Sequence, residues 1–382
     1  MSNTWSIIQS LQPFLQEAWE KSNFIKPTPI QDKSIVSILE GKDVIAESPT
    51  GTGKTLAYLI PALHKIDVEN KNVQVLILAS SRELVMQILE EIRIWSKGSK
   101  IEAAALIGGA DIKRQLEKLK KKPHIIVGTP GRVVELVQMK KLKVHEVKTI
   151  VFDEGDQLFS DEHQKEVDQI IKSTMKIKQV LVFSATLQEE VEKKAKERMA
   201  DPLVIRIKDG GIQKENVDHF YIVCEEREKL TILRKLMNIK NMKALAFTNN
   251  KNQIEMYAAK LEYKGLRPGV LYSERTKQER ETAIKRFRSG KYPLLLATDV
   301  ASRGLDIKGL THVVQLEIPK DEKQYTHRAG RIGRAGKSGV VLSLVTRIEV
   351  QRLLKLGKKL AVNMKEVRLY KGILQPVKKR DY

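Results

Sequence analysis

The fold of this chain depends most on one stretch, Ser48-Pro49-Thr50-Gly51-Thr52-Gly53-Lys54-Thr55. It lies between a short apolar run at 43–46 and another at 56–60, so a glycine-rich turn connects an expected buried strand to a helix start. Gly51 and Gly53 allow backbone N–H groups to point at a phosphate, and the helix N-terminus adds partial positive charge. The pattern predicts a nucleotide-binding P-loop, in which Lys54 reaches the β- and γ-phosphates and Thr55 ligates Mg²⁺. Ser48 replaces the first glycine of the usual spacing, which is tolerated if this residue needs no positive φ.

The composition indicates a folded, strongly basic chain. With 382 residues, roughly two or three domains are expected. Hydrophobic residues make up 41% and charged residues 30%, and the formal net charge is +22. Such a charge favours a polyanionic partner, most plausibly nucleic acid, although a solvated basic surface is the simpler alternative.

Cysteine usage and hydropathy exclude several classes of protein. Cys224 is the only cysteine, so an intramolecular disulfide and a cysteine-rich zinc module are both excluded. The first fifteen residues lack the pattern of a signal peptide, and no apolar run approaches the length of a membrane span. We therefore expect a cytoplasmic protein without a membrane partner.

Apolar runs alternate with helical stretches throughout the first half. Residues 5–21 have the spacing of an amphipathic helix, and runs of strand character follow at 73–78, 124–127, 149–152 and 179–183. Continuous apolar strands separated by helices predict a parallel sheet covered on both faces. Polar segments follow these strands at 80–83, 128–132, 153–156 and 184–186. Because ligands of such sheets bind beyond the carboxyl ends of the strands, these segments should converge on the P-loop.

Asp153 and Glu154 are the most informative of these polar residues. Burying two carboxylates after an apolar strand costs several kcal/mol unless a cation compensates. Mg²⁺ on a nucleotide supplies that cation, so Asp153 would hold the metal and Glu154 would orient or deprotonate the attacking water. A purely structural role for the pair is the alternative.

The proline-containing loop at 24–31 precedes the P-loop. Pro27 and Pro29 keep it out of regular structure, and a helix is expected from residue 32 onward. The amide of Gln31 could read a base edge, since it carries both a donor and an acceptor. From spacing alone, a proline-stopped helix entry is the favoured interpretation.

The second half repeats the α/β pattern without a P-loop. The polar segment 208–215 contains Gly210 and Gly211 and is the best linker candidate. Strand-like runs resume at 220–223, 244–247, 268–271, 294–297, 312–314 and 340–342. We therefore expect an ATP-binding domain at 1–207, a linker at 208–216 and a second α/β domain at 217–382. Arginines interleaved with glycines at 298–306 and 327–334 are suited to phosphate contact and could act as arginine fingers in cis.

These motifs together resemble the DEAD-box ATP-dependent RNA helicases of bacterial type. The resemblance rests on the ordered segments 24–31, 48–55, 82–84, 108–109, 129–132, 153–156, 184–186, 298–306 and 327–334. It implies two tandem RecA-like α/β domains, each with a mainly parallel sheet covered by helices on both faces, and an activity that depends on ATP, Mg²⁺ and RNA. It reverses the preferred interpretation of the loop at 24–31, because it implies that Phe24 stacks on adenine and that Gln31 reads its edge.

The resemblance also implies roles for residues in both domains. Asp306 would touch the ribose, and Arg331 and Arg334 would meet the γ-phosphate. Coupling of the ATP site to RNA would involve Ser184, Thr186, Asp156 and His327. The contacts to the RNA sugar-phosphate backbone, which carry no sequence information, would come from Arg82, Gly109, Thr129, Arg132, Arg280, Thr298 and Arg303.

Four departures from the family pattern stand out. Gly155 replaces the alanine of the namesake tetrad, and Ser80-Ser81 replaces the usual Pro-Thr before Arg82. In the second half, Tyr272-Ser273 replaces a His-Gly pair, and Lys277 replaces a glutamine. The last two departures concern expected RNA contacts, although Lys277 could still meet a phosphate.

The C-terminal segment 355–382 is rich in basic residues. Leu353, Leu356 and Leu360 predict a last helix packed on the second domain with a basic outer face. That face is either solvated or an auxiliary RNA surface. We further expect a monomer that acts on RNA in a ribonucleoprotein or ribosomal-precursor context. A slow-turnover ATP-dependent RNA clamp and a P-loop ATPase with a non-RNA substrate are the alternative functions.

Overall fold

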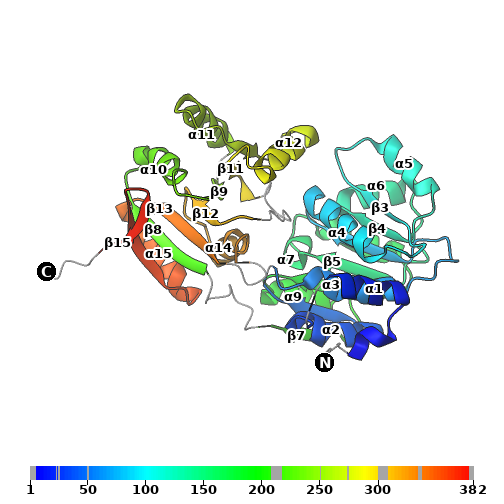
Figure 1. Cartoon of the computed structure of the whole chain (residues 1–382). Helices are drawn as coiled ribbons and strands as arrows, with labels where there is room; N and C mark the ends of the chain where they lie inside the picture. The colour runs from blue at the N-terminus through cyan, green and yellow to red at the C-terminus, as the bar shows by residue number, and fades with distance from the viewer. Residues whose placement is uncertain are drawn as a thin grey trace. The chain divides into compact units, whose positions relative to one another are not determined.

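The chain folds into two compact units, Met1–Gly210 and Gly211–Tyr382. The structure is a computed structural model that describes residues 6–22, 24, 26–49, 51–207, 217–249, 251–272, 275–299, 309–333 and 338–377. The predicted linker at 208–216 lies outside the described residues. Each unit is built around one sheet (Figure 1).

The first unit contains a seven-stranded sheet in the order β3-β4-β2-β5-β6-β1-β7, and every neighbouring pair is parallel. Its strands are β1 (Val44–Glu47), β2 (Val75–Ala79), β3 (Ala103–Leu106), β4 (Ile125–Gly128), β5 (Thr149–Asp153), β6 (Gln179–Ser184) and β7 (Leu203–Arg206). Its helices are η1 (Ser6–Ser10), α1 (Pro13–Lys21), α2 (Pro29–Leu39), α3 (Lys54–His64), α4 (Arg82–Trp95), α5 (Ile112–Lys120), α6 (Pro130–Gln138), α7 (Gly155–Leu158), α8 (Gln164–Ser173) and α9 (Glu189–Lys196).

Helices cover both faces of this sheet, and successive strand residues enter two different cores. On β1, Val44 and Ala46 join the core beneath α1 to α4, while Ile45 joins the core that includes side chains of α6, α8 and α9. All three residues are fully buried. The continuous apolar runs therefore reflect burial on both faces, which confirms the predicted doubly covered parallel sheet.

The second unit contains an eight-stranded sheet in the order β10-β11-β9-β12-β13-β8-β14-β15. All its pairings are parallel except β14 with β15. Its strands are β8 (Val217–Val223), β9 (Ala244–Phe247), β10 (Gly269–Leu271), β11 (Leu294–Ala297), β12 (His312–Gln315), β13 (Gly339–Val345), β14 (Met364–Tyr370) and β15 (Ile373–Pro376). Its helical segments are η3 (Glu226–Glu228), α10 (Lys229–Leu236), α11 (Lys251–Tyr263), α12 (Lys277–Arg288), α14 (Glu322–Ala329) and α15 (Arg347–Lys359).

The structure differs from the sequence-based expectations at a few elements. The helix expected at 5–21 is divided into η1 and α1, because Pro13 starts a new helix at its first position. The sequence pattern did not predict β3, which is rich in alanine, or the exposed edge strand β7. The last helix is α15, with Leu353 and Leu356 buried as expected, but the chain then continues into β14 and β15.

No described helix is both long and apolar enough to cross a membrane.

Candidate ATP and RNA site

The P-loop joins β1 to α3, as the sequence predicts. Gly51 has φ 82° and Gly53 has φ 90°, so both adopt the left-handed conformation that favours glycine. Ser48 is not among the residues with positive φ, which explains why a serine is tolerated there. Its hydroxyl lies 2.7 Å from that of Thr52, and the Thr52 hydroxyl donates to the Pro49 carbonyl at 2.8 Å. These bonds hold the loop in shape.

Lys54 lies at the start of α3 and points back across the loop. Its Nζ donates to the Ser48 carbonyl and to the Pro49 carbonyl, the latter at 2.7 Å. The ammonium therefore lies among backbone oxygens at the mouth of the P-loop. A nucleotide phosphate would replace these neutral acceptors with charged oxygens, which form stronger hydrogen bonds with a cation.

Gln31 lies in the first turn of α2, which begins at Pro29 and not at residue 32 as expected, because a proline fits the first position of a helix. Its side chain is 3% exposed, its Oε1 accepts from the Thr28 N–H at 2.9 Å, and its Nε2 donates to the Gly53 carbonyl at 3.2 Å. A Cβ at Gly53 would lie 2.5 Å from Gln31 Nε2, so a glycine is required for this approach. The structure thus brings the Gln31 amide to the nucleotide loop.

Phe24 belongs to an aromatic cluster that the sequence analysis did not identify. Its ring is stacked on Trp95, with centroids 6.3 Å apart, and meets Trp19 edge to face at 5.6 Å. Both tryptophans are buried, whereas Phe24 is 47% exposed. The cluster therefore supports one face of Phe24 and leaves the ring accessible for stacking.

Asp153 ends β5 and is 4% exposed. Its Oδ2 accepts from the Tyr58 hydroxyl at 2.8 Å, and its Oδ1 accepts from the Glu154 N–H at 2.9 Å. Burial raises the pKa of Asp153, while the Tyr58 hydrogen bond and the charge of Lys54 act against that rise. The pKa of Tyr58 is raised because the phenol is desolvated and faces the Asp153 carboxylate. Tyr58, on α3, is a positioning residue that sequence reasoning missed.

Glu154 has a left-handed backbone, with φ 57° and ψ 51°. A non-glycine residue in this region costs about 1–3 kcal/mol, so surrounding contacts must hold it. One of them comes from Ser80, whose hydroxyl donates to Glu154 Oε2. The register of the sheet explains this contact, because Ala79 of β2 pairs with Asp153 of β5. The serine at the family's proline position therefore contacts the candidate catalytic carboxylate.

Ser184 connects the end of β6 to the acidic motif. Its hydroxyl donates to Asp156 Oδ1 at 2.8 Å, and the Thr186 hydroxyl lies 3.5 Å from Asp156 Oδ2. Asp156 and Ser184 are 2% and 0% exposed. The predicted coupling residues of the first unit thus form one network, in which Asp156 and Ser184 are buried and Thr186 is partly exposed.

The predicted RNA-contacting residues of the first unit converge on the loop after β3. A Cβ at Gly109 would lie 2.2 Å from a guanidinium nitrogen of Arg82, so the two are in direct contact. The Thr129 hydroxyl accepts from the Gly108 N–H at 3.4 Å. Arg132 is 8% exposed and donates to the Ala110 carbonyl at 3.4 Å, so it supports the loop from beneath.

Comparisons with known proteins identify the family. Residues 28–194 match the DEAD/DEAH box helicase family, and residues 228–336 match the helicase conserved C-terminal domain. The chain is 52% identical over 372 residues to the probable ATP-dependent RNA helicase YfmL of Bacillus subtilis (strain 168), covering 97% of this chain and 98% of that protein. This chain belongs to the DEAD/DEAH box helicase family.

Further comparisons agree with this assignment of the helicase. It is 51% identical over 366 residues to the DEAD-box ATP-dependent RNA helicase CshC of Bacillus cereus, covering 96% of this chain and 94% of that protein. Among solved structures, it is similar to S. cerevisiae Dbp5 bound to RNA and ADP BeF3, with a TM-score of 0.85, 27% identity and 95% of each chain covered. A structure of Mss116p bound to ssRNA and AMP-PNP gives a TM-score of 0.83 at 26% identity, with 94% of this chain and 78% of that chain covered. The two tandem RecA-like domains of the prediction are thereby confirmed.

In the second unit of the helicase, the arginine-rich segment is anchored by a residue outside the predicted site. Arg328 of α14 is 1% exposed and binds Asp299 with two nitrogens, at 2.7 and 2.6 Å. It also donates to Asn249 Oδ1 at 2.6 Å and to the Glu317 carbonyl at 3.0 Å. A buried, fully bonded arginine of this kind fixes α14 against the ends of β9, β11 and β12.

The structure also describes other residues of the second unit that were predicted for the site. Arg331 is 6% exposed and donates from Nε to the His327 carbonyl at 3.2 Å. Arg280 lies on α12 and is 8% exposed, and the Thr298 N–H donates to the Leu271 carbonyl at 3.1 Å. The predicted site residues outside the described part of the chain are Thr50, Arg303, Asp306 and Arg334.

Proposed function

We propose that this DEAD-box helicase hydrolyses ATP in an RNA-stimulated reaction and separates short RNA duplexes locally. The observation that carries the proposal is the network of Asp156, Ser184 and Thr186. Asp156 follows Glu154 by two residues and Asp153 by three, so a movement of this network would reach both the nucleotide and the segment after β6. Relatives named ATP-dependent RNA helicases support the same activity.

The residues at the carboxyl edge of the first sheet fit Mg²⁺ carried by ATP. Asp153 is a buried carboxylate with a raised pKa, so its ionised form needs a cation nearby. Within the described residues, no group of three or more His, Cys, Asp or Glu side chains could hold a metal by itself. Mg²⁺ suits such a site, because it is usually bound by one or two carboxylates together with substrate phosphates. Asp153 and the Thr55 hydroxyl would hold the ion, which neutralises charge on the phosphate oxygens.

The protein residues around ATP would divide the work. Lys54 would exchange its backbone acceptors for the β- and γ-phosphates, and Glu154 would orient the attacking water and accept its proton. Phe24 would stack on adenine, and Gln31 would read the base edge with its remaining proton. Asp306 would contact the ribose.

The second unit would complete the catalytic site. Arg331 and Arg334 would stabilise the charge of the transferring phosphoryl group, a contribution on the order of a thousandfold or more in related NTPases. His327 would take part in coupling. RNA would favour the productive arrangement by binding residues of both units.

RNA contacts would be made mainly to phosphate and sugar. The residues concerned are Arg82, Gly109, Thr129, Arg132, Arg280, Thr298 and Arg303. Because Arg132 is buried and bonded to Ala110, it would act largely by holding the Gly109 loop in place. Removal of Arg82, which is exposed, should therefore reduce the salt dependence of RNA binding more than removal of Arg132.

We further propose a monomeric, cytoplasmic enzyme with domains at 1–207 and 217–382, joined by a linker at 208–216 and acting in ribonucleoprotein particles. Neither half alone would hydrolyse ATP at the RNA-stimulated rate. Measuring the isolated segment 1–207 with ATP and RNA tests this, since full activity in that segment would contradict the two-domain site.

The central experiment is ATP hydrolysis with and without single-stranded RNA. Without RNA, the wild-type protein should hydrolyse ATP very slowly. Glu154→Gln should abolish hydrolysis while still binding ATP and RNA together, and Arg331→Ala should lose most of the RNA-stimulated rate with little change in ATP affinity. Lys193→Ala, an exposed change on α9, is the matched control. Hydrolysis that does not respond to RNA would refute the proposal, and very slow RNA-stimulated turnover with tight RNA retention would favour an ATP-dependent clamp.

A further inference from the structure

A lysine-rich surface lies at the opposite edge of the first sheet from the nucleotide site. In a parallel sheet, the connections from helix to strand lie at the amino ends of the strands, whereas ligands bind beyond the carboxyl ends. Three such connections, α4 to β3, α5 to β4 and α6 to β5, together with the last turn of α5, contain ten lysines. We call these residues the amino-edge patch: Lys97, Lys100, Lys118, Lys120, Lys121, Lys122, Lys140, Lys141, Lys143 and Lys148.

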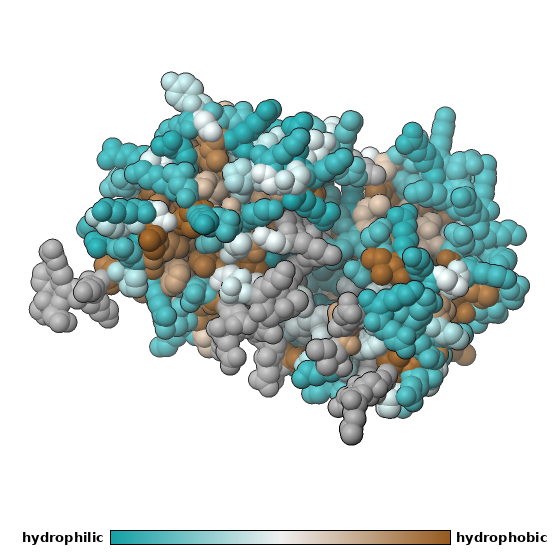
Figure 2. Space-filling model, viewed as in Figure 1, coloured by the Kyte–Doolittle hydropathy of each residue, from teal (hydrophilic) through white to brown (hydrophobic). Residues whose placement is uncertain are grey.

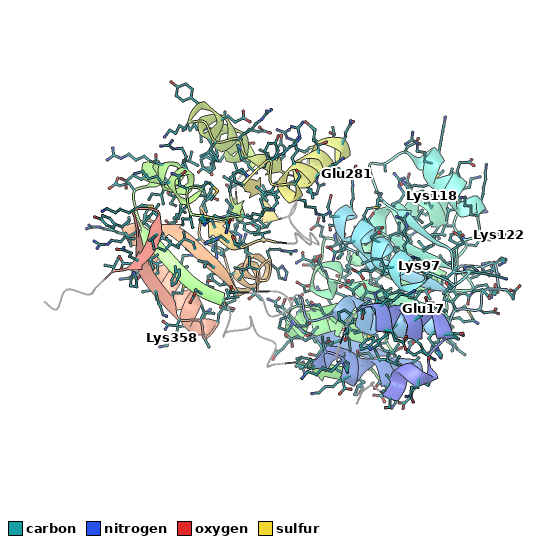
Figure 3. The ribbon with its side chains drawn as sticks, viewed as in Figure 1. Glu17, Lys97, Lys118, Lys122, Glu281 and Lys358 are labelled. Atoms are coloured by element: carbon teal, nitrogen blue, oxygen red, sulfur yellow. The ribbon has the colours of Figure 1, made fainter. Side chains whose placement is uncertain are left out.

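All ten side chains of the amino-edge patch are exposed. The strands that follow these connections are close neighbours, in the order β3-β4-β2-β5. Adjacent strands are about 4.8 Å apart, so the patch spans a compact surface. Lys97, Lys118 and Lys122 lie on the same side of the first unit in Figure 3, and the surface over α5 is mainly hydrophilic in Figure 2.

Strand register places some of these lysines side by side. Ala103 of β3 pairs with Ile125 of β4, and the His124 N–H donates to the Glu102 carbonyl at 2.9 Å. Lys100 lies two residues before Glu102, and Lys122 lies two residues before His124. Both lysines therefore lie at the amino ends of the neighbouring strands β3 and β4.

Few carboxylates neutralise the amino-edge patch. Lys120 forms an ion pair with Glu117 at 2.7 Å. Glu17 forms an ion pair with Lys21, and that hydrogen bond lowers the pKa of Glu17 more than the charge of Lys97 does. The other nine lysines of the patch, Lys97 included, have no carboxylate of the described residues within ion-pair distance. Concentrating so many like charges is unfavourable unless a counter-charge binds.

We propose that the amino-edge patch binds the phosphate backbone of an RNA segment outside the part held at the carboxyl edge. This proposal rests on the proposed RNA helicase function and adds a second RNA-binding surface to it. Lysine ammonium groups suit phosphates as point charges without reading sequence. A protein partner is disfavoured, because protein interfaces are depleted in lysine and enriched in aromatic residues and arginine.

The position of the amino-edge patch makes it a separate site rather than an extension of the first. The intervening strands have four or five residues, or about 15 Å at roughly 3.3 Å per residue. An RNA that fills only the carboxyl-edge site would not reach the patch. A longer RNA would engage both surfaces, which raises affinity through the effective concentration of the second contact.

The test compares two RNAs and two triple variants. One RNA is a single strand of about 10 nucleotides, near the size of one single-strand site, and the other is the same RNA with long unstructured flanks. The patch variant is Lys100→Ala, Lys121→Ala and Lys122→Ala together. The matched control removes three exposed lysines from α8, α9 and α11 by Lys165→Ala, Lys193→Ala and Lys260→Ala.

The expected result is a selective loss of binding to the flanked RNA. Three lost phosphate contacts reduce the slope of log affinity against log salt by about 2, and weaken binding by about tenfold at moderate salt. Hydrolysis stimulated by the short RNA should stay at the wild-type rate, which separates failure of this proposal from failure of the helicase function. Equal affinities and slopes for the patch variant and the control variant would overturn the proposal, as would equal losses with both RNAs. Loss of binding to an acidic protein with RNA binding unchanged would assign the patch to a protein instead.

Discussion

The hydrogen bond from Ser80 to Glu154 gives a direct test of how this helicase positions its catalytic carboxylate. Ser80→Ala removes one hydroxyl next to Glu154 Oε2 and leaves the backbone of β2 unchanged. Glu154 has a left-handed backbone that local contacts must maintain. Without the hydroxyl, the Glu154 carboxylate loses one of the contacts that hold its rotamer and would orient the attacking water less well.

The magnitude follows from the type of bond. A hydrogen bond to a charged group contributes about 1.5–3 kcal/mol, and the lower end applies here because Glu154 is only partly buried. Since about 1.4 kcal/mol corresponds to a factor of ten in rate, Ser80→Ala should reduce kcat by about tenfold. KM for ATP should change little, because Ser80 contacts neither the P-loop nor Gln31 in the described hydrogen bonds.

The assay is steady-state ATP hydrolysis at saturating RNA, with kcat and KM determined separately. Ser80→Thr keeps the hydroxyl and should retain most of the activity, while Ser80→Pro introduces the residue usual in the family and lacks the donor. A wild-type kcat for Ser80→Ala would refute the positioning role, and so would a Ser80→Thr variant as impaired as Ser80→Ala.

Three further predictions concern buried groups. Burial lowers the pKa of His219 from 6.5 to about 4. As the pH falls, His219 is therefore protonated in the unfolded chain before it is protonated in the folded protein, and the free energy of unfolding should fall by up to about 1.4 kcal/mol per pH unit between pH 6.5 and 4. Denaturant titrations should show a smaller fall for His219→Gln than for the wild type, and equal falls would contradict this. Gly155→Ala should destabilise the protein by about 1–3 kcal/mol, because a Cβ would lie 2.6 Å from Val182 Cγ1. Adding Val182→Ala to this variant should recover much of the lost stability in thermal unfolding. If the stability effects of the two substitutions were strictly additive, the contact would be contradicted. Tyr58→Phe should raise the Mg²⁺ concentration needed for half-maximal ATP hydrolysis by about tenfold, since it removes a hydrogen bond that orients Asp153. An unchanged Mg²⁺ dependence of hydrolysis would show that Tyr58 does not orient Asp153 for the metal.

The sequence predicted most of the strands because both faces of each sheet are buried. Runs such as 149–152 and 294–297 are apolar at every position, and they correspond closely to β5 and β11. The elements that were missed have weaker patterns. β3 consists largely of alanine, and the second residue of β14 and several that follow it are exposed. Strands built of alanine or with exposed positions contain few large apolar residues, so their hydrophobic signal is small.

The parts of the candidate site that could be predicted are those where the local sequence determines the backbone conformation. Gly51 and Gly53 have the positive φ that the P-loop spacing requires. The hydrogen bond between Ser184 and Asp156 joins two residues that the resemblance names for coupling, but the resemblance did not predict that they touch. Tyr58 and Ser80 could not be found in this way, because their importance depends on which strands are neighbours. Only the pairing of Ala79 with Asp153 places Ser80 beside Glu154.

The strand order also explains how two departures from the family pattern fit one site. β5 carries Asp153 at its end and lies between β2 and β6. On the β6 side, Val182 fills the space where the Cβ of an alanine at 155 would lie, so Gly155 is closely packed although it has no side chain. On the β2 side, Ser80 is less rigid than the proline usual in the family, but its hydroxyl donates a hydrogen bond to Glu154. In both cases a neighbouring strand provides a contact that restrains the catalytic segment, and we therefore expect combined replacement of Ser80 and Val182 by alanine to reduce kcat by more than the product of the two single effects.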